Sequence, residues 1–193
     1  MIMPWDKAYD RKSEEAKREK EHIRNQLIGK ASNDTGHLME KMILCGADMY
    51  LHQNRVRLIK VPEPFRVVSK KGGKATVYFI AHAEPDFIGC LFGGRCIAIE
   101  AKYTATDKIK VDMITKNQAA VLDRYHELGA YAFICCGIQD KYYLIPWPAF
   151  KEIPEKLGHR YAMQKDLRQY EVRCTGNAIM FLDYVRGHHG KKK

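Results

Sequence analysis

The sequence predicts an α/β fold in which a central β-sheet is flanked by helices and a β-hairpin stalk projects from the domain. Two pairs of β-forming runs are joined by glycine-containing turns, within residues 62–84 and 86–102. The run 131–136 is apolar on both faces, as in a buried strand, and a further strand follows at 141–145. Helical patterns precede the first hairpin and follow the second. These observations together indicate a single sheet covered by helices.

Composition and charge favour a polyanionic partner. The chain has 193 residues, of which 46% are hydrophobic and 29% are charged, and its formal net charge is +10. This basic balance favours nucleic acid, ahead of an anionic membrane surface. No apolar run approaches the ~20 residues that span a bilayer, and residues 1–6 lack the apolar core of a secretion signal. We therefore expect a cytoplasmic protein without a membrane partner.

The cysteines do not predict a zinc site. Six cysteines occur without any C-x-x-C spacing, so neither zinc ligation nor a disulfide framework is expected. Cys135 and Cys136 are adjacent on an apolar strand, and their side chains should point to opposite faces. Reduced core thiols in a cytoplasmic protein fit this pattern.

The domain organisation follows from charge and composition. Residues 1–33 are predicted to form a charged helical arm, lying on DNA, on a partner subunit, or mobile. Residues 34–186 form one domain, with the stalk at about 64–82. The tail, 187–193, is basic and expected to be disordered.

Individual elements can be placed on this frame. A loop is predicted at 29–36, a helix at 36–47 with an apolar stripe, and a strand that ends near residue 61. The stalk pairs residues 65–69 with 75–80 across a tip that carries Lys70, Lys71 and Lys74.

The second half of the chain continues with a lysine-bearing loop and then mostly with helices and strands. The predicted elements are a loop at 104–112, a helix at 115–128 stopped by Gly129, strands at 131–136 and 141–145, a short helix or turn at 150–157, and a late helix near 177–185.

The hairpin at 86–102 carries charge where a core strand should not. The apolar arm 96–99 runs directly into Glu100 and Lys102, which share one face of a strand, and Asp86 begins the opposing arm. Burying ionised groups is costly unless they are paired or bind a metal. Two carboxylates and an ammonium converging here suggest a divalent-metal phosphodiesterase site. A surface hairpin with charged ends is the simpler alternative.

The loop length decides whether the carboxylates meet. A two-residue loop at Gly93-Gly94 would place Asp86 opposite Ala101, whereas a three-residue loop over 92–94 pairs Asp86 with Glu100. Three-residue hairpin loops usually end in a left-handed residue, and Gly94 suits that position. We therefore predict the odd-length loop.

The order of these motifs resembles the PD-(D/E)xK nuclease superfamily, and more narrowly the RecU-type Holliday junction resolvases. The resemblance covers roughly residues 34–153. The motifs that carry it are Pro85-Asp86-Phe87, Ile99-Glu100-Ala101-Lys102, Lys116-Asn117-Gln118, the helix entry Gly36-His37-Leu38-Met39-Glu40, and the basic hairpin inserted at 65–80. It implies a restriction-endonuclease-like mixed central β-sheet and a homodimeric, Mg²⁺-dependent (or Mn²⁺-dependent) endonuclease that cuts four-way DNA junctions.

The resemblance also implies roles for individual residues. Asp86 and Glu100 become metal ligands, together with the backbone carbonyl of Ala101. Lys102 orients or deprotonates the attacking water. Gln118 supports this arrangement from its helix, and Glu40 supplies an outer carboxylate. Such a carboxylate pair suits Mg²⁺ or Mn²⁺ better than Zn²⁺.

The basic residues fall in the stalk and in the loop that follows the metal hairpin. Lys70, Lys71 and Lys74 at the stalk tip are expected to meet phosphates at the junction centre. Lys108 and Lys110 contact phosphate or merely solubilise their loop.

Alternatives remain open for single residues and for the whole protein. Gln118 with Thr115 also matches a helix capping box, and Glu40 also reads as a solvated helix residue. The same site would serve a nuclease that cuts linear or flap DNA. A non-catalytic junction-binding protein would bind without metal-dependent cutting, and an interaction protein independent of nucleic acid is a further class.

Overall fold

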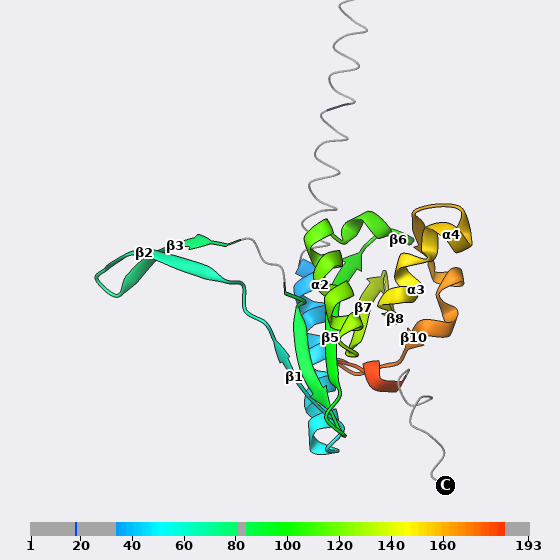
Figure 1. Ribbon diagram of the computed structural model, residues 1–193, viewed down its shortest axis with the longest axis horizontal. Coiled ribbons are helices and arrows are strands. Elements are labelled where there is room, and N and C mark those ends of the chain that lie inside the picture. The colour runs from blue at the N-terminus through cyan, green and yellow to red at the C-terminus, as the bar shows by residue number, and fades with distance from the viewer. Residues whose placement is uncertain (1–17, 19–33, 81–83, 184–193) are drawn as a thin grey trace, which may run out of the picture.

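A mixed six-stranded sheet with helices on both faces forms the body of the protein (Figure 1). The computed structural model describes residues 18, 34–80 and 84–183. The predicted arm over 1–33, apart from the helical and exposed Arg18, and the predicted tail over 187–193 lie outside these residues. Within the described part of the chain, no helix combines the length and apolar character that crossing a bilayer requires.

The order of the strands confirms the predicted α/β fold. The sheet runs β1 (Val56–Lys60), β4 (Phe87–Leu91), β5 (Cys96–Thr104), β7 (Tyr131–Ile138), β8 (Lys141–Pro146) and β10 (Glu171–Val172). β5 and β7 are parallel, and the other neighbours are antiparallel. A parallel pair needs a crossover connection, and α2 (Lys116–Glu127) supplies it.

The central strands separate two hydrophobic cores. β7 is buried along nearly its whole length, as a strand covered on both faces should be. Cys135 packs into the core under the helix at 34–52, whereas Cys136 packs into the core under α2. The prediction that these two side chains point to opposite faces is confirmed.

The first described helix is longer than the predicted one. It spans residues 34–52, so the loop predicted up to residue 36 gives way to helix from residue 34. Its end is fixed by Asn54, whose φ is 54° and whose N–H donates to the Leu51 carbonyl at 2.9 Å. A left-handed residue just after a helix satisfies carbonyls that would otherwise lack partners.

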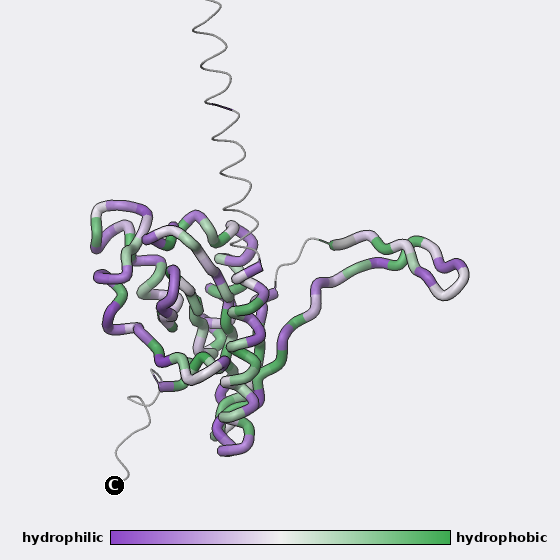
Figure 2. Tube along the Cα trace, turned by 180° about the vertical axis from the view of Figure 1, so that it is seen from behind, coloured by the Kyte–Doolittle hydropathy of each residue, from purple (hydrophilic) through white to green (hydrophobic). Residues whose placement is uncertain are grey.

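The stalk is a two-stranded hairpin that stands away from the sheet (Figures 1 and 2). β2 (Phe65–Lys71) pairs with β3 (Lys74–Phe79), with a β-bulge between Val67 and Ser69. The turn is Gly72-Gly73, and both glycines have positive φ, as two-residue hairpin turns require. The predicted hairpin is therefore confirmed.

Two secondary-structure predictions for the second half of the chain are wrong, and the first concerns the loop predicted over 104–112. The loop predicted over 104–112 contains β6 (Lys108–Lys110), which pairs with β9 (Tyr161–Met163), and a 3₁₀ turn, η1 (Val111–Met113). β6 has a single apolar residue, Ile109, and its partner strand β9 lies far along the chain. Such a short strand gives no alternating pattern that would predict it from the sequence.

The late helix near 177–185 is not formed in its described part. Residues 174–179 form the hairpin of β11 (Cys174–Thr175) and β12 (Ala178–Ile179), followed by the 3₁₀ turn η4 (Phe181–Asp183). The run from Ala178 to Leu182 is buried throughout, and a short continuous apolar run does not distinguish a helix from a strand.

The remaining elements lie between β8 and β11. They are α3 (Trp147–Lys151), α4 (Ile153–Leu157), η2 (Gln164–Asp166) and η3 (Arg168–Tyr170). The predicted short helix or turn at 150–157 corresponds to the end of α3 and to α4.

Two glycines in the first helix should respond oppositely to substitution. A Cβ on Gly46 would lie 2.1 Å from the Ile179 carbonyl oxygen, whereas nothing lies within 4 Å of a Cβ on Gly36. We predict that Gly46→Ala lowers the free energy of unfolding by about 1–3 kcal/mol because the backbone of β12 must move. Gly36→Ala should raise it by up to about 1 kcal/mol through helix propensity. Urea unfolding of both variants checks this, and equal effects would contradict it.

Candidate metal centre

The β4–β5 hairpin has the register that brings the two carboxylates together. Phe87 lies directly opposite Ile99, so the next pair along the ladder joins Asp86 and Glu100. The odd-length loop over 92–94 is thereby confirmed.

The turn achieves this register with two left-handed glycines. Gly94 N–H donates to the Leu91 carbonyl at 2.9 Å, and Leu91 N–H donates to the Arg95 carbonyl at 2.8 Å. Gly93 and Gly94 have φ angles of 91° and 87°, which glycine adopts without the steric cost that a Cβ imposes.

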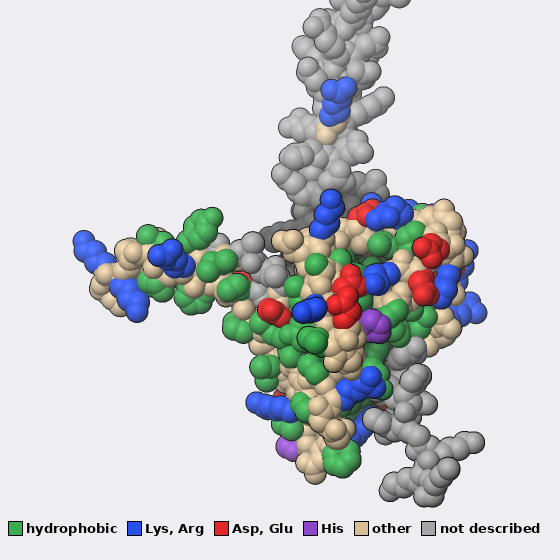
Figure 3. Space-filling model, in the orientation of Figure 1, with side chains coloured by type: hydrophobic (Ala, Val, Ile, Leu, Met, Phe, Trp, Pro, Cys, Tyr) green, Lys and Arg blue, Asp and Glu red, His purple; other side chains and the backbone are tan. Residues whose placement is uncertain are grey.

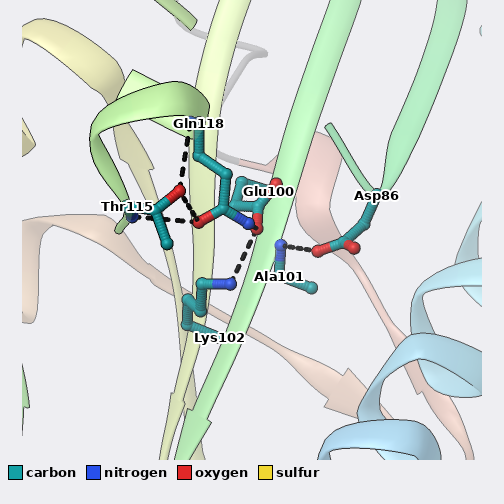
Figure 4. A network of polar contacts seen from close by, with 6 residues as sticks. All are labelled: Asp86, Glu100, Ala101, Lys102, Thr115 and Gln118. Atoms are coloured by element: carbon teal, nitrogen blue, oxygen red, sulfur yellow. Dashed lines mark hydrogen bonds and ion pairs between the residues drawn. The ribbon is translucent and has the colours of Figure 1, made fainter. Parts of the chain in front are cut away.

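Glu100 is a buried acid on the face of the sheet that α2 covers. Its side chain is 1% exposed, while its neighbours Ile97 and Ile99 point into the opposite core. One carboxylate oxygen, Oε1, accepts from Lys102 Nζ at 2.7 Å and from Gln118 Nε2 (Figure 4). The other oxygen, Oε2, is buried and accepts no hydrogen bond of regular geometry from the described residues. Burial, and then the charge of Asp86, raises the pKa of Glu100 to about 7.

Asp86 lies at the start of the opposing arm and is held by the backbone. Its Oδ2 accepts from the Ala101 N–H at 2.8 Å (Figure 4), and its own carbonyl accepts from the Val61 N–H at 2.8 Å. Burial raises the pKa of Asp86, and the Ala101 N–H and Lys102 act in the other direction. The charge of Asp86 contributes to the raised pKa of Glu100. A cation bound between the two acids would favour their ionised forms.

Gln118 combines the two roles that its sequence position suggests. Its backbone N–H donates to Thr115 Oγ1 at 3.2 Å, and its Oε1 accepts from the Thr115 N–H at 3.0 Å. These contacts form the capping box that starts α2. The Nε2 of the same side chain reaches Glu100, so the start of the helix is tied to the buried acid.

Glu40 lies beside this group and contacts different partners. It is 19% exposed, forms an ion pair with Lys60 at the end of β1, and lies 3.5 Å from His37 Nδ1. Its charge is one of the minor contributions that raise the pKa of Asp86, after burial. The structure thus places Glu40 close enough to Asp86 to affect its pKa, and its role as an outer carboxylate stays a prediction.

The basic residues predicted to bind DNA lie in two places. Lys70, Lys71 and Lys74 are exposed at the outer end of the stalk (Figure 3). Lys108 is half-buried, with Nζ 4.8 Å from the centre of the Tyr161 ring, and Lys110 is exposed. Both belong to strand β6 rather than to a loop, and Lys108 already has an aromatic partner.

Some contacts around the centre had no usable signal in the sequence. Tyr125 in α2 donates to Glu84 Oε2 at 3.0 Å, which ties the chain just before Asp86 to the helix that carries Gln118. Lys60 is paired with Glu40. Tyr125 and Glu84 are 41 residues apart along the chain, and Lys60 and Glu40 are 20 residues apart. Only the fold brings these partners together.

The residues present fit a hard divalent cation. Glu100 Oε2 is a buried carboxyl oxygen with no hydrogen-bond partner in the described part of the chain, so ionising this group is costly unless a cation compensates the charge. The described residues contain no group of three or more His, Cys, Asp and Glu side chains able to hold a metal. Two carboxylates are the kind of oxygen ligand that a hard divalent cation such as Mg²⁺ takes.

Comparison with known proteins identifies the family. The family model described as "Recombination protein U" (RecU) matches residues 34–188. The chain belongs to the RecU family. Membership confirms the resemblance seen in the motifs and extends it from residue 153 to residue 188. It also assigns the protein to the nucleases of DNA recombination.

One solved structure is similar to this RecU chain at low sequence identity. The solved structure of Hjc from Archaeoglobus fulgidus, described as a Holliday junction resolvase from an archaeal hyperthermophile, is 16% identical. The match covers 52% of this chain and 70% of that chain, with a TM-score of 0.34. No curated protein sequence matched the chain.

Neutralising the buried acid should stabilise the metal-free protein. The pKa of Glu100 rises from 4.5 to about 7 on folding, so above pH 7 the folded state carries the full cost of its ionisation. We predict that Glu100→Gln raises the free energy of unfolding at pH 8 by roughly 1–3 kcal/mol. Urea unfolding in the presence of a chelator measures this.

A matched variant and a metal titration complete the test. Glu152, 48% exposed and paired with Lys156, should change stability by less than about 0.5 kcal/mol as Glu152→Gln. Millimolar Mg²⁺ should raise the melting temperature of the natural protein and leave that of Glu100→Gln unchanged. A less stable Glu100→Gln, or an equal response to Mg²⁺, would contradict the assignment.

Proposed function

We propose that the protein is a divalent-metal-dependent endonuclease that resolves four-way DNA junctions by hydrolysing phosphodiester bonds. The observation that carries the proposal is the convergence of Asp86 and Glu100 at one end of the hairpin. Asp86 Oδ2 accepts from the N–H of Ala101, the residue after Glu100. The Glu100 side chain is 1% exposed and accepts from Lys102 Nζ. RecU family membership supports it.

The chain's own residues would divide the chemistry between them. Asp86, Glu100 and the Ala101 carbonyl would hold Mg²⁺ or Mn²⁺, which when bound neutralises charge on the phosphate and acidifies water. Lys102, 2.7 Å from Glu100, would orient the attacking water or take its proton. Gln118 would keep the Glu100 carboxylate in place from the start of α2, and Glu40 would add negative charge at the edge.

The stalk provides the feature that would select branched DNA. Lys70, Lys71 and Lys74 stand at the end of a hairpin that projects from the domain (Figure 3). The hairpin also exposes apolar side chains, among them Phe65, Val68 and Tyr78. We propose that it enters the open centre of a junction, where phosphates of several arms converge, and that recognition rests on shape more than on base sequence.

A homodimer would suit a substrate that must be cut on two strands. A two-fold symmetric protein matches the two-fold symmetry of a four-way junction and brings one centre to each cut strand. We also propose a cytoplasmic location, where the DNA substrate is found. The mass of the protein in solution, measured by light scattering alone and with a junction, tests the dimer.

Cleavage by site variants tests the chemistry. Asp86→Asn and Lys102→Ala should lower the single-turnover rate of junction cleavage about 100-fold or more and retain most junction binding. Asp48→Asn, at an exposed position of the first helix, should cleave as the natural protein does. Cleavage unchanged by Asp86→Asn would reject the site. Binding without any metal-dependent cutting by the natural protein would instead indicate a junction-binding protein.

Removing the stalk tests substrate selection. Val67 and Val77 are directly paired, so deleting residues 68–76 and joining these two with an Asn-Gly turn should leave the domain folded. We predict that the deletion abolishes the preference for junctions over linear duplex while cleavage chemistry survives. A retained preference would refute the role of the stalk.

A charge variant separates shape from electrostatics. Replacing Lys70, Lys71 and Lys74 with Ala keeps the hairpin and removes its charge, so junction affinity should fall and depend less steeply on salt. Flap and duplex substrates assayed at the same salt concentration would reveal a nuclease for linear or flap DNA.

A further inference from the structure

Cys90 and Cys96 lie directly opposite each other in the β4–β5 hairpin. The next pair toward the turn, Leu91 and Arg95, is hydrogen-bonded, because Leu91 N–H donates to the Arg95 carbonyl at 2.8 Å. Antiparallel pairs alternate, so the cysteines occupy a non-hydrogen-bonded pair. The Cα atoms of such a pair are about 4.5 Å apart, within the range of about 4.4–6.8 Å that disulfides span.

Hydrogen bonds on the other side of β4 support the same assignment. Phe92 N–H donates to the Arg55 carbonyl, and Val61 N–H donates to the Asp86 carbonyl. Even-numbered residues of β4 therefore turn their backbone groups toward β1. Cys90 is one of them, so its backbone does not bond to β5, and its side chain stands next to that of Cys96.

Exposure makes this pair chemically accessible. Cys90 is exposed and Cys96 is half-buried, whereas Cys135 and Cys136 are fully buried. Burial, and then the neighbouring Cys90 sulfur, raises the pKa of Cys96. An exposed thiol that reacts first, beside a more protected thiol that reacts second, is the arrangement that a resolving pair needs.

We propose that Cys90 and Cys96 form a reversible disulfide site on the hairpin of the metal centre, oxidised by a low-molecular-weight disulfide such as oxidised glutathione. The Cys90 thiolate attacks one sulfur of the disulfide, forming a mixed disulfide and releasing one thiolate. The Cys96 thiolate then attacks the Cys90 sulfur, forming the Cys90–Cys96 bond and releasing the second thiolate. Two cysteine sulfurs are oxidised, and the reagent is reduced to two thiolates. These thiolates take up from solvent the two protons that the cysteines lost, and become thiols.

The position of the bond determines its consequence. The pairs 88–98 and 90–96 follow one another along one face of the hairpin. The next positions on that face are 86 and 100, so the disulfide lies roughly 13 Å from the carboxylates. A covalent link at this position holds the register that pairs Asp86 with Glu100. The oxidised protein therefore keeps its metal centre and resists unfolding of the hairpin. This inference does not depend on the proposed nuclease activity.

Thiol counting and peptide mapping test the bond itself. The full chain, equilibrated in buffers of increasing oxidised-to-reduced glutathione ratio, should lose two of its six thiols and yield one disulfide joining Cys90 to Cys96. Reduction with dithiothreitol should restore both. A variant with Cys45→Ser and Cys174→Ser, the other exposed cysteines, should behave identically. A lasting glutathione adduct on Cys90, a bond to another cysteine, or six thiols throughout would overturn the proposal.

Thermal unfolding tests the consequence. The oxidised protein should melt at a higher temperature than the reduced protein, and Cys90→Ser should remove the difference. Because Cys90 is exposed, the Cys90→Ser variant should fold as the natural protein does. No difference in the natural protein, or the same difference in Cys90→Ser, would overturn the stabilising role. Neither readout uses DNA cleavage, so failure here is distinguishable from failure of the proposed function.

Discussion

A buried carboxylate at the end of a core strand is the constraint around which the rest is arranged. Glu100 follows three fully buried residues of β5 and is itself 1% exposed. An acid in this position must be neutralised, paired or bound to a cation. Lys102, Gln118 and Asp86 all converge on it, yet one oxygen has no hydrogen-bond partner among the described residues. The fold therefore carries a local cost that protonation or a bound cation would remove, as functional sites often do.

The register of the β4–β5 hairpin fixes the position of Asp86 relative to Glu100. Because side chains alternate along a strand, a slip of one residue would send Asp86 to the face opposite Glu100. Two glycines of positive φ set the loop length, and the ladder to β1 continues up to Asp86 itself. The same register places Cys90 beside Cys96. The pairing of β4 with β5 therefore positions both the acids and the thiols.

Features encoded by neighbouring residues were predictable, and features that join distant segments were not. The charged strand end at Glu100, the odd-length loop and the capping box at Gln118 each depend on a few consecutive residues, and the structure contains all three. The pairing of β6 with β9 and the contact of Tyr125 with Glu84 join distant segments. The late helix failed because a buried apolar run carries no period that separates helix from strand.

The attachment of the stalk has a consequence for how this chain can vary. Its two ends leave the sheet beside each other, where Val61 N–H meets the Asp86 carbonyl at 2.8 Å. The hairpin is thus a modular insertion between strands that are already joined, and its length and tip are free to diverge while the catalytic body stays the same. With the role proposed for the stalk, substrate choice and bond cleavage can evolve separately, and stalks exchanged between homologues would give nucleases for other branched DNAs.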